Sequence, residues 1–196
     1  MGGRAGNETA RRHQTPPALP AFGGPLYPVA MAKDETFDIT TGCDLQEVAN
    51  AVNQAKKEIS TRFDFKNVVA EIDYEHGDTK IGLHAADDYK LDAMWQVLTG
   101  RLIARSVPVK NLVRGTPQKA TQGTLRQEVT LVQGIEQEIA KKIVRFVKEQ
   151  KYKKAQAQVQ GDAVRVSAPS RDELQLVIKD LKAQDYGIEL KFGNYR

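Results

Sequence analysis

The chain has 196 residues, of which 29 are lysine or arginine and 25 are aspartate or glutamate, giving a formal net charge of +4. A single cysteine, Cys43, excludes an internal disulfide framework and is typical of a reducing compartment. No apolar run approaches the roughly 20 residues that a membrane-spanning helix needs. We therefore expect a soluble, cytoplasmic protein with one or two small domains.

The charge is distributed unevenly along the chain. Residues 31–113 carry 10 basic and 14 acidic side chains, whereas residues 114–196 carry 16 basic and 10 acidic ones. The second half is therefore +6, which favours an anionic partner such as a nucleotide or a nucleic acid. A solvated lysine surface would explain the same charge.

Residues 1–34 differ in composition from the rest of the chain. The first 30 residues contain 5 of the 8 prolines and 5 of the 15 glycines. This composition predicts a disordered N-terminal extension. Because the segment has no apolar core, it does not resemble a secretory signal.

Two kinds of periodicity alternate in residues 35–113. Apolar residues recur at every second position in some segments and at helical spacing in others. Asp44 and Glu47 form a capping-box pattern that predicts the start of a helix. In chain order, the expected elements are a strand at 37–39, a helix at 45–59, strands at 68–74 and 81–83, a helix at 91–102 and an edge strand around Pro108.

The same order of elements returns after residues 114–122, which are expected to form a linker. Gly161 and Asp162 suit a two-residue hairpin turn, and Ser170 with Glu173 repeats the capping-box pattern. The elements expected in residues 123–196 are a strand at 125–132, a helix at 135–146, strands at 157–159 and 164–166, a helix at 174–181 and a strand at 188–192. The chain therefore predicts an α+β fold of two ferredoxin-like βαββαβ domains, at 35–113 and 123–196.

In such a fold both helices cover one face of each sheet and leave the other face open. The open face of the second domain is expected to be polar and mildly basic, with Gln156, Gln158, Gln160, Arg165, Ser167, Arg126, Glu128, Thr130 and Lys191. The open face of the first is expected to be more acidic, with Asp38, Thr40, Val69, Glu71, Asp73, Lys80, His84 and Lys110. Two interpretations remain open: the glutamines and Arg165 hydrogen-bond a nucleotide, or the face is a solvated or inter-domain surface.

Residues 62–66, RFDFK, form a second candidate site. Arg62 and Lys66 could hold a phosphate, Phe63 or Phe65 could stack on a base, and the Asp64 carboxylate could accept hydrogen bonds from a guanine edge. The alternative is a structural elbow in which the phenylalanines are buried and Arg62 completes the end of the preceding helix.

A third candidate surface lies on the lysine-rich helix 134–149 and the segment after it. Its basic residues could contact a nucleic-acid backbone or an acidic partner, or they could simply be the solvated side of the helix. They are Lys141, Arg145, Lys148, Lys151, Lys153 and Lys154. No pattern in the sequence suggests a catalytic group, a metal site or a cofactor.

Five segments resemble the bacterial YajQ family: FDITTGCDLQEVANAV, RFDFKNV, GIEQEIAKKIVRFVKEQKYKKAQAQVQGDAVRV, SRDELQLVI and LKFGNYR. The resemblance covers residues 31–196. It implies two ferredoxin-like domains, with N-terminal strands that are candidates for exchange, and the binding of nucleotides. It also implies a cyclic di-GMP effector that acts through a transcription factor, while RNA or GTP binding is ascribed to the family as well. Ala168 and Pro169 stand where the family more often has Gly-Lys, which removes one candidate phosphate-binding lysine.

The sequence as a whole predicts a non-enzymatic nucleotide-binding protein. The expected ligand is cyclic di-GMP, GTP or ATP, and its binding is expected to change the affinity for a regulatory partner. An RNA-binding module that uses helix 134–149 and a protein-interaction adaptor are the alternatives.

Overall fold

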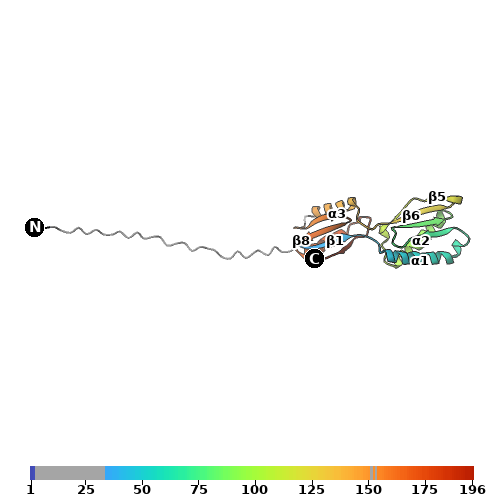
Figure 1. Ribbon diagram of the computed structural model, residues 1–196, viewed down its shortest axis with the longest axis horizontal. Helices are drawn as coiled ribbons and strands as arrows, with labels where there is room; N and C mark the ends of the chain where they lie inside the picture. The colour runs from blue at the N-terminus through green and yellow to red at the C-terminus, as the bar shows by residue number, and fades with distance from the viewer. Residues whose placement is uncertain (3–33, 151, 153) are drawn as a thin grey trace. The chain divides into compact units, whose positions relative to one another are not determined.

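The computed structural model describes residues 1–2, 34–150, 152 and 154–196. The predicted disorder of residues 1–34 therefore lies almost wholly outside the described residues. The described chain forms two antiparallel sheets, each with its own pair of helices (Figure 1). This arrangement confirms the predicted α+β fold of tandem ferredoxin-like domains.

One sheet has the strand order β2-β3-β6-β4, with β5 paired to β6. Its strands are β2 (Ala70–Asp73), β3 (Lys80–Ala85), β6 (Leu125–Leu131), β4 (Leu112–Arg114) and β5 (Gln118–Lys119). Helices α1 (Leu45–Thr61) and α2 (Asp88–Ala104) share a hydrophobic core with these strands. We call this assembly the β6 lobe, after its central strand.

The other sheet has the strand order β7-β8-β1-β9. Its strands are β7 (Gln156–Gln160), β8 (Ala163–Ala168), β1 (Glu35–Thr40) and β9 (Lys191–Gly193). Helices α3 (Gln137–Glu149) and α4 (Arg171–Lys182) share its core. We call this assembly the β1 lobe.

The first strand of each repeat is exchanged. Strand β1 pairs with β8 and β9 from the second half of the chain, and Figure 1 shows it in blue among orange and red strands. Strand β6 takes the matching central position between β3 and β4. Both strands place apolar side chains at alternate positions toward their helices, with Phe37 and Ile39 fully buried in one and Val129 in the other. Either strand therefore satisfies the pattern that a central strand requires.

The exchange corrects the predicted open faces. Arg126, Glu128 and Thr130 do not accompany the glutamines, because β6 pairs with β3 in the β6 lobe. Asp38 and Thr40 likewise do not belong with the acidic residues of β2, since β1 pairs with β8 and β9. Both predictions assumed that consecutive segments form one sheet, and both are wrong for that reason.

Local signals placed most helix starts and the tight hairpin correctly. Asp44 accepts hydrogen bonds from the Gln46 and Glu47 N–H groups at the start of α1, and Ser170 accepts one from Glu173 N–H at the start of α4. Gly161 has φ +62°, and Gln160 and Ala163 pair on either side of the two-residue turn. That positive φ suits glycine at the first central position of the turn.

The edge strand predicted around Pro108 is wrong. A short 3₁₀ helix, Val109–Asn111, precedes β4. Asn111 is fully buried, and its side chain donates to Thr41 Oγ1 at 2.9 Å and accepts from the Glu189 N–H at 2.8 Å. These bonds connect the loops after β1 and before β9 to the 3₁₀ helix, so the chain turns at Asn111 instead of extending.

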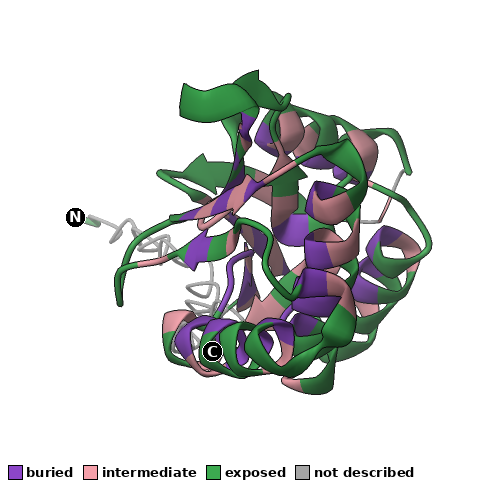
Figure 2. Ribbon diagram, turned by 90° about the vertical axis from the view of Figure 1, so that its right-hand side faces the viewer, coloured by how far each residue is buried: buried purple, intermediate pink, exposed green. Residues whose placement is uncertain are grey.

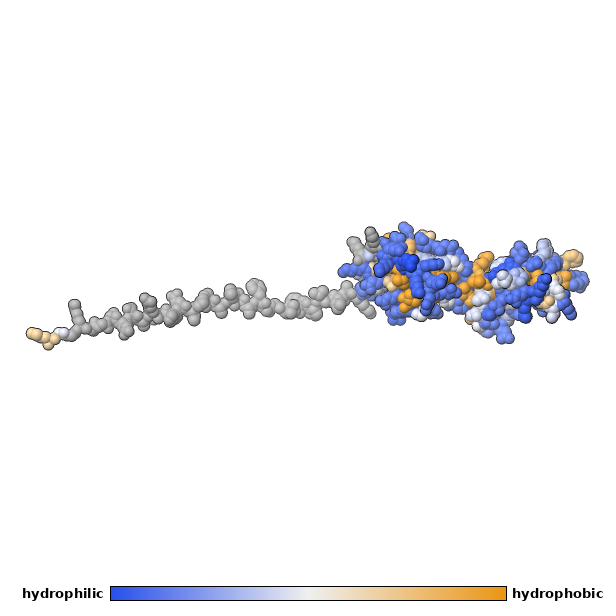
Figure 3. All heavy atoms as spheres, turned by 90° about the horizontal axis from the view of Figure 1, so that it is seen from above, coloured by the Kyte–Doolittle hydropathy of each residue, from blue (hydrophilic) through white to orange (hydrophobic). Residues whose placement is uncertain are grey.

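Residues 114–122, predicted as a linker, contain paired backbone. Arg114 ends β4, and Gln118–Lys119 forms β5 against β6. Buried residues, shown in purple in Figure 2, lie on helices and strands alike. The surface in view in Figure 3 is mainly hydrophilic and is interrupted by hydrophobic patches.

Candidate functional site

The RFDFK segment begins where α1 ends. Thr61 is the last helical residue, and Arg62 takes an extended conformation with φ −74° and ψ +135°. The Arg62 N–H still donates to the Glu58 carbonyl at 3.1 Å. A 3₁₀ turn, Phe63–Phe65, follows directly. The chain therefore changes direction at Arg62 and presents successive side chains on different sides.

Arg62 and Asp64 form a two-pronged ion pair within this turn. Arg62 Nε and Nη2 donate to the two Asp64 carboxylate oxygens, each at 2.9 Å. These hydrogen bonds hold the pKa of Asp64 below its ordinary value and raise that of Arg62. The two side chains keep 38% and 41% of their surface exposed, so water screens the pair and a ligand can reach it.

The two phenylalanines beside this pair have opposite environments. Phe65 is 6% exposed and packs into the core, with the Arg62 guanidinium 5.5 Å and the Lys90 ammonium 5.7 Å from its ring centre. Phe63 is 88% exposed. The structural-elbow interpretation therefore fits Phe65 but not Phe63, whose ring is exposed to solvent.

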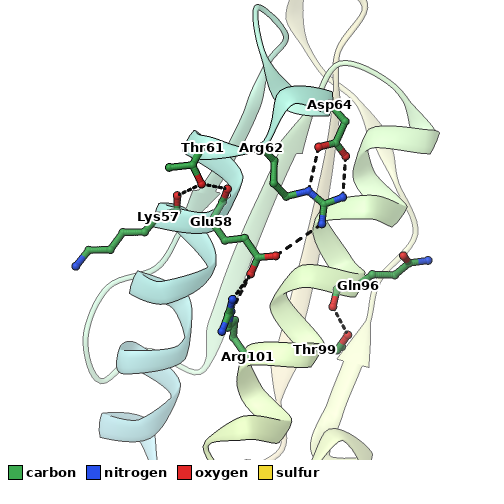
Figure 4. Close-up of polar contacts among 8 residues, drawn as sticks. All are labelled: Lys57, Glu58, Thr61, Arg62, Asp64, Gln96, Thr99 and Arg101. Atoms are coloured by element: carbon green, nitrogen blue, oxygen red, sulfur yellow. Dashed lines mark hydrogen bonds and ion pairs between the residues drawn. The ribbon is translucent and has the colours of Figure 1, made fainter.

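A second arginine joins the cluster from α2 (Figure 4). Arg101 Nη2 lies 2.7 Å from a Glu58 carboxylate oxygen, while Arg62 Nη1 lies 3.7 Å from the other oxygen. Glu58 thus sits between two guanidinium groups, and Figure 4 shows both pointing toward it. A cavity of about 330 Å³ adjoins this cluster and is lined by Glu58, Arg62, Gln96, Val97, Gly100 and Arg101.

Glu58 and Arg101 are members of this site that were not predicted from the sequence. Glu58 stands four residues before Arg62 on α1, and that spacing places the two side chains together, so it could have been found. Arg101 is 43 residues from Glu58 and reaches it only through the packing of α2 against α1. No local pattern signals that contact.

The glutamine candidates lie on the open face of the β1 lobe. Register pairs Gln158 with Arg165 and Gln156 with Ser167, which puts these polar residues on one side of the sheet. Arg165 is already engaged: its Nε and Nη2 donate to the Asp38 carboxylate at 2.7 and 2.9 Å. Asn194 donates to the same carboxylate at 3.1 Å. Gln156 and Gln158 line a cavity of about 310 Å³ between α3 and β7, whereas Gln160 and Arg165 do not line it.

The basic residues of α3 are exposed, as the sequence predicted. Lys141, Arg145 and Lys148 all point to solvent, and Lys154 is exposed beyond the helix. The Lys154 N–H donates to a Glu173 carboxylate oxygen at 3.1 Å, which anchors the backbone there. Lys151 and Lys153, the other two candidates, lie outside the described residues.

A larger cavity lies elsewhere, on the side of the β6 lobe sheet that α1 and α2 do not cover. Its volume is about 590 Å³, and its wall is rich in carboxylates. Lys80 pairs with Glu128 at 3.0 Å and Arg126 with Asp73 at 3.0 Å. Glu75 and Asp78 add further negative charge to the wall. An anionic ligand would therefore meet a net negative surface, which makes this cavity a poorer candidate than the Arg62 cluster.

Searches for other kinds of site give negative results within the described residues. No group of three or more histidine, cysteine, aspartate or glutamate side chains there could hold a metal ion. None of the helices in that part of the chain has the length and apolarity that a bilayer crossing demands.

The strand order defines a strand-exchanged protein of two ferredoxin-like domains with exposed ionic clusters. Residues 35–196 match the family described as "Nucleotide-binding protein YajQ-like", and the chain belongs to that family.

Similar proteins cover nearly the whole of this region. A protein of Koribacter versatilis named as a nucleotide-binding protein is 51% identical over 163 residues, which is 83% of this chain and 98% of that protein. Another of Desulforamulus reducens is 49% identical, covering 85% and 99%. A third, of Bacillus cereus, is 46% identical, covering 85% and 100%.

Proposed function

We propose that this protein is a non-enzymatic nucleotide-binding protein and that the cluster around Arg62 is its ligand site. The observation that carries the proposal is the cavity lined by Arg62 and Arg101, two arginines that share the Glu58 carboxylate, with the exposed Phe63 directly after Arg62 in the chain. The Phe63 side chain is 88% exposed, so its ring is accessible to a ligand. The names of the related proteins support nucleotide binding.

Each group of the cluster has a role in this proposal. The Phe63 ring stacks on a base, as exposed aromatics do in sequence-tolerant nucleotide sites. The Asp64 carboxylate accepts hydrogen bonds from the N1–H and N2–H edge of guanine, which favours guanine over adenine. Arg62 and Arg101 hold phosphate oxygens at the cavity, and Lys66, exposed at the end of the segment, adds a further positive charge.

The preferred ligand in this proposal is a guanine nucleotide with more than one negative charge, cyclic di-GMP among them. Two arginines share one carboxylate, Glu58, so a phosphate can replace Glu58 as their partner without leaving a buried charge unpaired. Ligand binding then changes the affinity for a regulatory partner such as a transcription factor, because the ligand binds one arrangement of the cluster better than another.

A pair of substitutions at Gly100 tests the site without destroying the fold. A Cβ added at Gly100 meets no atom within 4 Å, so the position opens into the cavity. Gly100→Ala and Gly100→Leu should each stabilise α2 by about 1 kcal/mol, because glycine is a poor helix former. Only the leucine fills the cavity.

The measurement is calorimetric titration of the full chain with cyclic di-GMP, GTP and ATP. We expect saturable binding to the wild type and to Gly100→Ala, with guanine ligands preferred, and binding at least tenfold weaker to Gly100→Leu. Absence of saturable heat with every nucleotide would contradict nucleotide binding. Equal affinity of the two variants would contradict the location.

The predicted RNA-binding alternative uses α3 and stays a prediction. It requires an affinity for RNA that falls steeply with salt, because lysine contacts to phosphates release counterions. Retention of a single-stranded RNA that is insensitive to salt, or no retention, would argue against it.

A further inference from the structure

Strand β7 is an outer strand of the β1 lobe sheet, and its sequence lacks the residues that usually prevent an edge strand from pairing with another chain. The strand reads QAQVQ, without a charged residue or a proline. The corresponding edge of the β6 lobe, β2, reads AEID and carries Glu71 and Asp73. Charged residues on edge strands prevent pairing with other chains. Strand β7 therefore keeps an edge that can accept another strand.

The hairpin register shows which backbone groups of β7 face outward. Gln160 and Ala163 close the two-residue turn, so they form a hydrogen-bonded pair, and bonded pairs then alternate along the strands. The N–H and C=O groups of Ala157 and Val159 consequently point away from β8. Within the described chain, no turn, loop or cap backbone hydrogen bond involves either residue. An added strand would find these groups available.

An apolar groove runs beside this edge. A cavity of about 310 Å³ lies between α3 and β7, and its apolar wall consists of Val144, Val147, Tyr152, Ala155 and Ala157. The hydroxyl of Tyr152 donates to an Asp180 carboxylate oxygen at 2.6 Å, which fixes the ring in place. Val159, 43% exposed, extends the apolar surface along the strand. Alternate side chains of an added strand would point into this groove.

The basic residues beside the groove favour an acidic partner. Lys148 lines the cavity, and Lys141 lies on the same face of α3 because it is seven residues earlier. Arg145 and Lys154 are exposed nearby in the sequence. The acidic residues of these elements are Glu138 and Glu149 of α3 and Asp180, whose carboxylate already accepts from the Tyr152 hydroxyl. A second copy that paired its own β7 with this strand would bring its lysines against these lysines. An acidic partner would bring carboxylates to them instead.

We propose that β7 and the groove beside α3 form a docking site for an extended, acidic segment of a partner protein. The segment adds to β7 as a further strand through the outward N–H and C=O groups of Ala157 and Val159. Its apolar side chains enter the groove at alternate positions, and its carboxylates contact Lys148 and Lys141. This site is separate from the cluster around Arg62 and does not depend on nucleotide binding.

The test uses a fluorescein-labelled peptide of about ten residues in which valine alternates with aspartate. A matched peptide with lysine in place of aspartate serves as the ligand control. Two substitutions weaken the site by different routes. Ala157→Pro removes an outward N–H without removing a bond to β8, and Lys148→Glu reverses the charge at the groove while leaving the fold intact. Ser167→Lys changes the open sheet face on the neighbouring strand β8, outside the groove, and is the protein control.

We expect saturable binding of the acidic peptide to the wild type. Binding should be at least tenfold weaker to Ala157→Pro and to Lys148→Glu, and unchanged for Ser167→Lys. Amide hydrogen exchange should slow at Ala157 and Val159 when the peptide binds. Equal binding of both peptides, full binding by Lys148→Glu, or no binding to the wild type would overturn the proposal. Displacement of the bound peptide by single-stranded RNA with no slowing of exchange at β7 would assign the surface to nucleic acid and overturn it too.

Discussion

Each lobe holds an arginine in a two-pronged ion pair with an aspartate, but the two pairs form in different ways. Arg62 and Asp64 are two residues apart and meet in a single turn. Arg165 and Asp38 are 127 residues apart and meet only because β1 crosses into the other lobe. Their surroundings differ as well: Asp64 keeps 38% of its side chain exposed, whereas Asp38 keeps 12%. The local pair is suited to exchange partners with a ligand, and the long-range pair is suited to hold the exchanged strand.

The largest expected effect comes from removing the side chain that anchors the exchanged strand. Phe37 is fully buried, lies opposite Val166 and packs on Phe192 at a ring distance of 5.9 Å. Phe37→Ala should lower the free energy of unfolding by about 3–5 kcal/mol.

A double-mutant cycle then tests whether the strand is exchanged. Phe37→Ala and Val166→Ala should be coupled by at least about 0.5 kcal/mol in urea unfolding, whereas Phe37→Ala and Leu83→Ala should add within about 0.5 kcal/mol. The opposite pattern would place β1 beside β3 and remove the basis for the Arg165–Asp38 pair.

The second prediction compares the stability of two matched variants. Arg165→Gln removes the guanidinium group that donates to the Asp38 carboxylate at two positions. Asp38 is only 8% exposed, and Asn194 alone still donates to its carboxylate. Arg62→Gln leaves the Asp64 carboxylate without its arginine, but water can solvate that carboxylate because the Asp64 side chain is 38% exposed. Urea midpoints should therefore fall clearly for Arg165→Gln and stay close to the wild type for Arg62→Gln. Equal losses would show that both pairs serve the fold alike.

The third prediction concerns the stability of the protein at low pH. Hydrogen bonds from Arg165 hold the pKa of Asp38 below its ordinary value, against the opposing effect of burial. The folded state therefore binds fewer protons than the unfolded state as the pH falls below about 4. The stability from this pair is complete above that pH and is lost as the pH falls through the lowered pKa. Asp38→Asn should be less stable than the wild type at pH 7, and the gap should narrow at pH 3. A gap that is constant with pH would contradict an ionised pair.

The smallest expected effect concerns Glu58, which competes with a ligand for both arginines of the Arg62 cluster. Glu58→Gln should strengthen nucleotide binding several-fold and lower the free energy of unfolding by no more than about 1 kcal/mol, since partly exposed ion pairs contribute little. Calorimetry and urea unfolding measure the two effects. Weaker nucleotide binding would show that Glu58 positions the arginines for the ligand instead of competing with it.

Local chemistry in the sequence was enough to predict much of the fold. The caps at Asp44 and Ser170 and the turn at Gly161 each depend on neighbouring residues, so the sequence reveals them directly. The strand exchange could not be derived in this way. The patterns around Phe37 and Val129 both describe a central strand, and nothing local says which sheet each one enters.

The candidate site also combines features that neighbouring residues reveal with contacts that only the tertiary structure reveals. Arg62, Asp64 and the phenylalanines are adjacent, and their chemistry was readable, but the sequence did not show that Phe65 is buried and Phe63 exposed. Arg101 reaches Glu58 because α2 packs against α1, and Asp38 reaches Arg165 because β1 is exchanged. Both contacts depend on tertiary structure, where periodicity carries no information.

The most direct test is a calorimetric titration of cyclic di-GMP into the wild type, Arg62→Gln and Arg165→Gln under the same conditions. We predict that Arg62→Gln binds at least tenfold more weakly than the wild type, and that Arg165→Gln binds with wild-type affinity at a temperature where it is folded. Loss of binding by Arg165→Gln with full binding by Arg62→Gln would contradict the account and place the ligand on the glutamine face of the β1 lobe.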